Sequence, residues 1–159
     1  MAKLKTSGIN ETIKMLEALG KNTDDIFSDA LKKGAGVATD SMRLEVKSLK
    51  TSDEYEGGNG KRYAKPADVK GLLDSLGFTP VKSQGTILNV NVGWDGYNSD
   101  KTKKYPNGHA NRMIANAINK GTSFMIAQPF INKAKRKAES KCIDAIESEL
   151  TKELKKISK

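Results

Sequence analysis

Apolar residues recur at helical spacing in two long stretches of the chain. The first stretch opens at Thr23, and its apolar stripe comprises Ile26, Phe27, Ala30, Leu31, Ala35, Ala38, Met42 and Val46. The second stretch follows Pro129, and its stripe comprises Phe130, Ala134, Ala138, Cys142, Ile146, Leu150 and Leu154. Positions three and four residues apart share one face of an α-helix, so both stretches are predicted to be long amphipathic helices. Pro129 fits the first position of the second helix, where its missing N–H costs nothing.

Three shorter helices are predicted from the same spacing. Asn10 can cap the first and Gly20 can end it, and its apolar face comprises Ile9, Ile13, Leu16 and Leu19. The second is capped by Asp68, and its apolar residues are Val69, Leu72, Leu73 and Leu76. The third runs from Asn111 to a stop at Gly121, and the residues expected to point inward are Met113, Ile114, Ala117 and Ile118.

The stretches "GFTPVKS" and "TILNVNVGW" are separated by Gln84 and Gly85, and in the second stretch the residues of one face alternate with Ile87, Asn89 and Asn91 on a largely polar face. This alternation is typical of a β-hairpin with one buried face, here Thr86, Leu88, Val90, Val92 and Trp94. The whole pattern predicts an α+β fold: a small antiparallel β-sheet with N-terminal helices and a long C-terminal amphipathic helix. We expect a single domain over residues 1–159, with the distal half of the last helix packed on the N-terminal helices or on another subunit.

Two long polar segments, residues 50–66 and 95–109, interrupt these elements and are predicted to be mobile loops. The first contains "GGNGKR" but lacks the spacing of a phosphate-binding loop. The second offers the oxygens of Asp95, Asn98 and Asp100 but lacks the spacing and terminal Glu of an EF-hand. Neither segment therefore predicts a ligand site.

The net charge of +9 favours anionic partners, but the kind of basic residue matters. Only four of the 28 basic residues are arginine, and the bidentate contacts of sequence-specific readout depend on the arginine fork. The surface is therefore expected to act through diffuse electrostatics. An alternative reading is a basic, Lys-rich DNA-binding accessory protein that uses "NKAKRKAESK" at residues 132–141.

Residues suited to catalysis or metal binding are scarce. Cys142 is the only cysteine and His109 the only histidine, so no multi-histidine metal site or Cys-based zinc cluster can form within the chain. His109 is accompanied by no nucleophile or oxyanion motif. We expect a protein that is not an enzyme, with no cofactor and no metal. No apolar run approaches the ~18 residues of a membrane span, and a cytosolic origin is expected.

Three short motifs resemble the HK-ninety-seven gene-product-ten-like family of tailed bacteriophages. The helix start Gly8–Ile13 resembles the beginning of that family, and Gly71–Leu76 resembles the step before its hairpin, with slightly altered spacing. The most specific likeness is the segment before the last helix, where "GTS" is followed by "AQPFI": Gly121, Thr122, Ser123, Ala127, Gln128, Pro129, Phe130 and Ile131. The likeness spans nearly the whole chain.

The resemblance implies a structural virion protein of the head–tail joint, variously called a neck, tail-completion or minor tail protein. It implies a homo-oligomeric ring, expected to be a hexamer, that connects the portal-connector to the tail tube. The implied partners are further copies of the chain, the adjacent head-completion or connector protein, and the tail-tube or tail-terminator protein. Viral DNA would pass through the ring lumen without specific binding. The implied locations are the virion and, during assembly, the host cytoplasm, with no membrane contact.

Two positions depart from the family pattern: Gln128 stands where Arg is frequent, and Asn119 where Glu is frequent. A salt bridge between these positions in relatives would here be replaced by neutral amides. The segment is interpreted as a structural joint or interface formed by Gly121, Thr122, Ser123, Pro129, Phe130 and Ile131. Phe130 is expected to be buried against the hairpin near Val90 or Val92, and Lys133 to lie on the solvated side of the helix.

Overall fold

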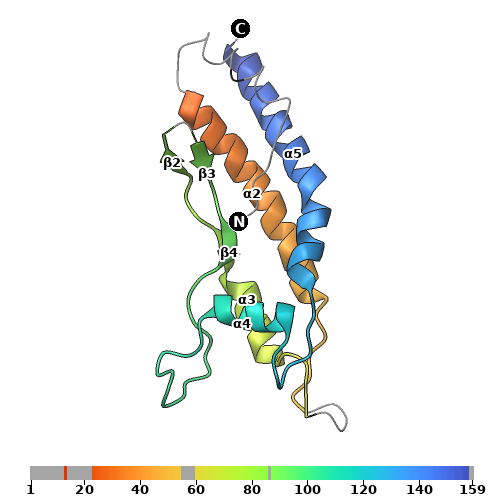
Figure 1. Ribbon diagram of the computed structural model, residues 1–159. Coiled ribbons are helices and arrows are strands. Elements are labelled where there is room, and N and C mark those ends of the chain that lie inside the picture. Colours follow the sequence, from red (N-terminus) through yellow and green to blue (C-terminus); the bar gives the residue numbers. More distant parts are fainter. Residues whose placement is uncertain (1–12, 14–22, 55–59, 86, 158–159) are drawn as a thin grey trace.

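Two long antiparallel helices form the axis of the molecule (Figure 1). The structure, a computed structural model, describes residues 13, 23–54, 60–85 and 87–157. Helix α2 spans Thr23–Lys47 and helix α5 spans Phe130–Ile157. Both predicted long helices and the α+β class are thereby confirmed, whereas the predicted helix beginning at Asn10 lies, except for Ile13, outside the described residues.

The upper half of the α2–α5 pair buries a small apolar cluster made of Ile26, Ala30, Ile146 and Leu150. Below it the helices are in close contact at Gly34, where the Cys142 thiol donates a hydrogen bond of 3.3 Å to the Gly34 carbonyl oxygen. A Cβ added at Gly34 would lie only 2.8 Å from side-chain atoms of Ile146. The distal half of α5 therefore packs on an N-terminal helix, which was one of the two arrangements expected from its apolar stripe.

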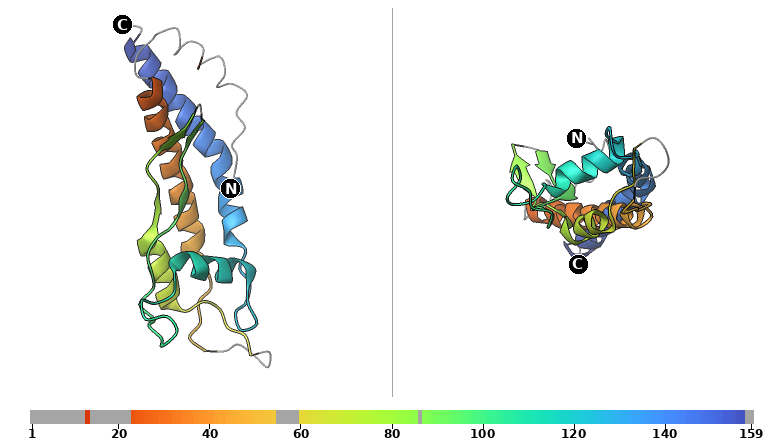
Figure 2. Two further views of the ribbon diagram at one scale, coloured as in Figure 1. Left: turned by 60° about the vertical axis from the view of Figure 1, so that its left-hand side comes forward. Right: turned by 90° about the horizontal axis from the view of Figure 1, so that it is seen from below.

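The predicted hairpin is present as one long two-stranded ribbon beside α2 (Figure 2). Strand β1 (Leu76–Phe78) pairs antiparallel with β4 (Val92–Trp94), and β2 (Lys82–Gln84) pairs with β3 (Ile87–Asn89). Between the two ladders, the Thr79 N–H donates to the Asn91 carbonyl oxygen at 2.8 Å. The turn at Gly85 has a φ of 64°, which glycine adopts without strain.

The expected burial of one hairpin face is only partly correct. Leu88, Val90, Val92 and Trp94 are only half-buried, and Thr86 lies outside the described residues; Ile87, on the opposite face, is 63% exposed. The reason is that part of this face lines an open groove instead of packing directly on the helices. We call this space of about 1370 Å³ the central groove; residues that line it include Leu31, Gly34, Ala35, Ala38, Met42, Phe78, Val90, Val92, Trp94, Arg112, Ile131, Lys135, Arg136, Cys142 and Ile146.

Two short helices close the lower end of the molecule and bury the larger part of the core. Helix α3 spans Pro66–Ser75 and α4 spans Asn111–Lys120. With the adjoining ends of α2, β1 and α5 they enclose a cluster that comprises Met42, Val46, Ala64, Val69, Leu72, Leu76, Ile114, Ala115, Ile118, Met125, Phe130 and Ala134.

Two sequence predictions about these short helices are wrong in detail. Asp68 does not cap α3, because the helix begins two residues earlier at Pro66, with Lys65 in the extended N-cap position. Pro66 is well suited to this start because it fixes a helical φ. In α4, Met113 is 56% exposed instead of inward, and Ala115 is buried in its place. The prediction favoured Met113 because its side chain is larger and more hydrophobic than that of Ala115.

The two long loops lie at the same end of the molecule, the lower end in Figure 1. Residues 95–109 close on themselves: the Asn98 N–H donates to the His109 carbonyl oxygen, and the His109 N–H donates to Asn98 Oδ1. In the other loop, the Ser52 N–H donates to the Ala64 carbonyl oxygen at 3.0 Å. Both loops therefore have hydrogen-bonded bases, and their mobility remains a prediction. No helix in the described ranges is both long enough and apolar enough to cross a bilayer.

Candidate functional site

The segment between α4 and α5, residues 121–131, is the candidate site, and it starts with a turn that requires glycine. Gly121 has a φ of 76°, and its N–H donates to the Ala117 carbonyl oxygen at 2.8 Å, which ends α4. A Cβ at this position would lie 3.0 Å from Ala127. Backbone conformation and lack of space thus both select glycine. The turn continues with the Thr122 N–H donating to the Met125 carbonyl oxygen, while Ser123 is exposed.

The middle of the segment is fastened to the loop that follows α2. The Arg62 N–H donates to the Phe124 carbonyl oxygen at 3.0 Å, and the Ile126 N–H donates to the Arg62 carbonyl oxygen at 2.9 Å. Met125, between these two contacts, is buried in the lower core. Backbone pairing and side-chain burial together fix the path of the chain between α4 and α5.

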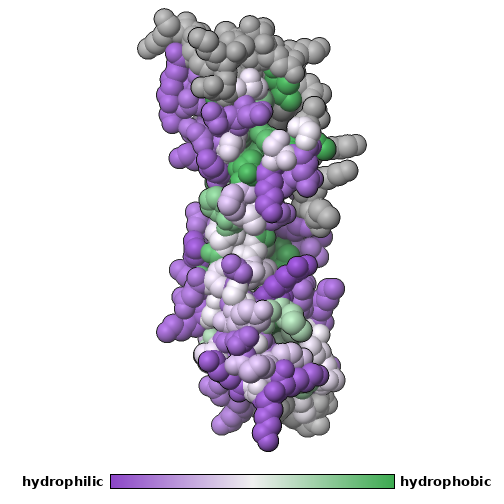
Figure 3. All heavy atoms as spheres, turned by 90° about the vertical axis from the view of Figure 1, so that its left-hand side faces the viewer, coloured by the Kyte–Doolittle hydropathy of each residue, from purple (hydrophilic) through white to green (hydrophobic). Residues whose placement is uncertain are grey.

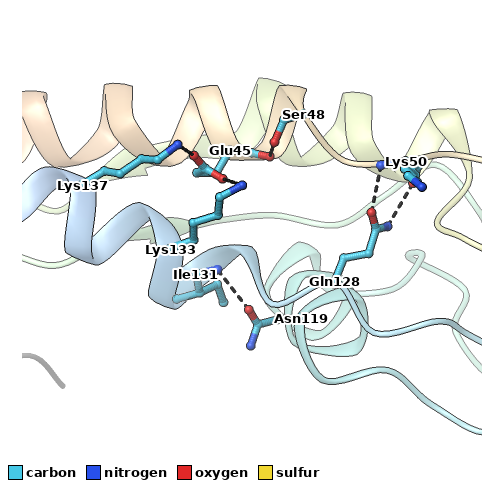
Figure 4. Close-up of polar contacts among 8 residues, drawn as sticks. All are labelled: Glu45, Ser48, Lys50, Asn119, Gln128, Ile131, Lys133 and Lys137. Carbon is cyan, nitrogen blue, oxygen red and sulfur yellow. Dashed lines mark hydrogen bonds and ion pairs between the residues drawn. The ribbon is translucent and has the colours of Figure 1, made fainter.

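Gln128 clamps the start of the loop after α2 to the start of α5 (Figure 4). Its Oε1 accepts from the Lys50 N–H at 2.8 Å, and its Nε2 donates to the Lys50 carbonyl oxygen at 3.0 Å. Both hydrogen bonds to one residue 78 positions away use the donor and the acceptor of the amide at once. An arginine side chain at this position has no acceptor, so it could not accept from the Lys50 N–H.

Asn119 has a different partner: its Oδ1 accepts from the Ile131 N–H at 3.0 Å. The first backbone N–H groups of a helix have no partner within the helix, so α4 caps the start of α5 through this side chain. Asn119 and Gln128 therefore do not pair with each other, as two residues that replaced a salt bridge would. Each amide makes its own backbone contact at the same joint (Figure 4).

Phe130 begins α5 and anchors it in the lower core. Its side chain is 3% exposed, and its ring meets Trp94 edge-on, with centroids 5.8 Å apart and planes inclined by 72°. Val92 also packs against the same core cluster. The predicted burial of Phe130 against the hairpin is thus confirmed, with Trp94 as the ring partner in place of Val90.

An ion group links the first turns of α5 to α2. Glu45 is only 4% exposed, and its carboxylate binds Lys137 Nζ at 2.5 Å and Lys133 Nζ at 3.2 Å. The hydrogen bond from Lys137, assisted by Lys133, lowers the pKa of the Glu45 carboxyl despite the opposing effect of burial. Lys133 lies on the solvated side as expected, with its side chain 59% exposed, but its ammonium group also pairs with the buried carboxylate, which the sequence did not predict.

Most residues predicted for this joint come together in it, with one difference at the helix start. Helix α5 begins at Phe130, so Pro129 immediately precedes the first helical residue instead of occupying it, and the Phe130 N–H donates to the Gln128 carbonyl oxygen. Sequence analysis missed the roles of Glu45 and Asn119. Lys133 and Lys137, four residues apart and thus on one face of a helix, were the available signal for a buried acidic partner.

Cys142 and His109 both lie outside the joint at residues 121–131. In the part of the chain that the structure describes, no three His, Cys, Asp or Glu side chains are grouped so that they could hold a metal ion. Burial raises the pKa of the Cys142 thiol, which favours the unreactive protonated form. The His109 ring lies against Tyr105, with centroids 4.2 Å apart, in the loop 95–109. What the joint can do chemically is fix the relative positions of α2, α4 and α5 and the base of loop 50–66.

Comparison with protein-family models, with curated proteins and with solved structures finds no match to this chain. The bacteriophage resemblance accordingly rests on the short motifs alone, of which the most specific coincides with the joint at residues 121–131.

Proposed function

We propose that this protein is a structural, non-enzymatic component of a tailed bacteriophage virion that forms a ring, a hexamer, at the head–tail joint. One observation carries the proposal: the segment with the most specific family likeness, residues 121–131, is the place where α2, α4, α5 and the base of loop 50–66 are joined. A motif with this role would preserve a rigid framework of helices, which a ring component needs.

The shape of the molecule supports the same proposal. The two long loops lie together at one end of an elongated body (Figure 1), and polar loops ordered at their bases are suited to contact neighbouring proteins. A closed ring uses two different faces of each subunit, because its contacts are heterologous. In this arrangement loops 50–66 and 95–109 contact neighbouring subunits or the adjacent connector and tail proteins.

Particles made without the gene for this protein test the proposal directly. We expect electron microscopy to show filled or empty heads separate from tails, and expression of the intact chain in trans to restore joined particles. In parallel, light scattering and negative-stain images of the purified protein or of purified particles should reveal a ring. Normal, infectious tailed particles in the absence of the chain would exclude the proposed role.

The second candidate is a Lys-rich DNA-binding accessory protein, and the net charge of +9 favours it. The ion group weakens this alternative, because Lys133 and Lys137 of the basic stretch 132–141 are bound to Glu45. Binding to duplex DNA measured over a range of salt concentrations separates the candidates. Submicromolar affinity at physiological salt, with log affinity falling steeply against log salt, would favour the accessory protein. Weak binding is expected for a ring whose lumen only lets DNA pass.

A further inference from the structure

The central groove leaves apolar surface without a partner in the described part of the chain. The residues that line it come from α2, the hairpin and α5, with Arg112 and Asn116 from α4. Figure 2 shows how these four elements are arranged. Phe78, which lines it, is 44% exposed, while Leu31 and Val92 are half-buried. On the hairpin side of the molecule, apolar patches lie between polar side chains and are largest in the upper half (Figure 3). Apolar surface of this kind marks a site where another segment or molecule packs.

The upper part of the groove adjoins the upper cluster, where some apolar side chains are only partly buried. Leu31, Gly34 and Ile146 line the groove there. Phe27, Leu31 and Leu154 pack only partly buried against the upper cluster. An occupant of this region therefore needs a continuous apolar face that follows one side of α2 for several turns.

We propose that the chain's own residues 8–20 dock in the upper part of the central groove. Sequence analysis predicts an apolar face for this segment, made of Ile9, Ile13, Leu16 and Leu19, with Gly20 after it. These positions fall on one face at helical spacing, which is the surface that the upper groove lacks. The proposal concerns the fold of one chain and does not depend on the proposed role in a virion.

The length of the connection determines which end of the groove the segment reaches. Only Lys21 and Asn22 separate Gly20 from Thr23, the first residue of α2. A helix over residues 9–19 is about 16 Å long at about 1.5 Å per residue. If this helix runs antiparallel to α2, it lies beside about eleven residues of α2, from Thr23 to the neighbourhood of Gly34. This places its apolar face over Phe27 and Leu31.

The short connection also favours a segment of the same chain over a second copy. A connector of two residues holds the segment at an effective concentration in the millimolar range or above, provided that its geometry permits docking. A second molecule would have to reach this concentration in solution to compete. Intramolecular docking is therefore the arrangement that the tether favours.

Cys142 provides a means to test the proposal, because this single cysteine lines the groove beside Gly34. We compare the rate of thiol labelling of the intact chain with that of Leu16→Asp, which places a charge on the apolar face. The matched control is Ala18→Asp, which adds the same charge on the opposite face of a helix. We expect several-fold faster labelling for Leu16→Asp and no change for Ala18→Asp, at rates that do not vary with protein concentration.

A cross-link in the full-length chain gives a second, independent measurement if Leu16→Asp unfolds the protein, as circular dichroism would reveal. A cysteine introduced as Ile9→Cys should be joined to Cys142 within one chain by a short bifunctional maleimide, whereas Glu11→Cys, on the opposite face, should not. Cross-links between chains, with labelling rates that depend on concentration, would assign the groove to a second copy and overturn the proposal. Equal labelling of both aspartate variants and equal cross-linking of both cysteine variants would overturn it as well.

Discussion

At the scale of single residues, Glu45 is a buried carboxylate that lies outside the predicted apolar stripe. A buried carboxylate without partners would cost several kcal/mol, and the two lysines of α5 offset this cost by binding it. Removing one partner leaves the other, whereas removing the carboxylate leaves two exposed lysines that water can solvate. The group therefore orients α5 on α2 more than it stabilises the fold.

The ion group makes stability depend on acidic pH. The folded pKa of Glu45 lies below its ordinary value of 4.5 because Lys137 donates a hydrogen bond to the carboxylate. Its contribution is therefore fully present above the unfolded pKa and is lost as pH falls through the lowered folded pKa. We predict that Glu45→Gln flattens the acidic part of the curve of unfolding free energy against pH. Denaturant melts between neutral pH and pH ~2 measure this curve, and an unchanged acid slope would contradict the assignment.

Phe130 and Lys133 lie three residues apart in α5 but differ in expected effect. Phe130→Ala removes a buried ring from the lower core and should cost about 3–5 kcal/mol, a large share of the ~5–15 kcal/mol of a small domain. Lys133→Ala leaves Glu45 paired with Lys137 and should cost about 1 kcal/mol or less. Urea melts of the two variants compare these costs. A larger loss for Lys133→Ala would mean that the joint depends on charge more than on packing.

At the scale of elements, the close approach of α2 and α5 at Gly34 determines how the helices pack. Glycine lowers helix propensity by about 1 kcal/mol relative to alanine, so its presence within α2 needs a compensating contact. That contact is the packing of Ile146 against Gly34, which is so close that a Cβ added at Gly34 would lie only 2.8 Å from the Ile146 side chain. Gly36 lies in the same helix, but a Cβ added there would meet nothing within 4 Å.

These two glycines form a matched pair of variants. Gly36→Ala should stabilise the protein by up to about 1 kcal/mol through helix propensity alone. Gly34→Ala gains the same propensity but forces Ile146 to move, and should be destabilising by about 1–3 kcal/mol. Thermal melts give both values. Equal stabilisation by the two substitutions would show that α5 can shift away from α2 without cost.

Much of the fold follows from local sequence signals, whereas most contacts of the joint do not. The long helices were predictable because their apolar spacing persists over many turns, and the hairpin because an alternating stretch follows a Gln–Gly turn. Gly121 was predictable as a helix stop for the same local reason. The start of α3 was misplaced because Asp68 and Pro66 both favour helix starts. The clamp from Gln128 to Lys50 could not be predicted, because nothing in either local sequence specifies a partner so far along the chain.

At the scale of the whole molecule, the core is distributed unevenly along the α2–α5 axis. Within the described residues, the lower cluster has twelve buried members and the upper cluster four. Regions with fewer buried contacts open more readily than the rest of a domain. The two ends of the same long helix should therefore differ in local stability.

Hydrogen exchange along α5 should reveal this difference. We predict slower exchange for backbone amides of residues 134–142, which run from the lower cluster to the contact with Gly34, than for those of residues 148–156, beside the upper cluster. Leu150→Ala should accelerate exchange in the second group more than in the first, since it removes one of four buried residues there. Uniform protection along the helix would mean that α5 opens only when the whole domain unfolds.

The antiparallel pairing of α2 and α5 has a mechanical consequence. Thr23 and Ile157 lie at the same end of the molecule, so tension applied between them pulls across the helix axes instead of along them (Figure 1). Such a load separates the helices one turn at a time from that end. It therefore disrupts the upper cluster before the contacts of Gly34, of Glu45 and of the joint. The helices should therefore separate at low force near Thr23 and Ile157. The opposite end, which carries the two long loops, should stay folded until the last turns separate.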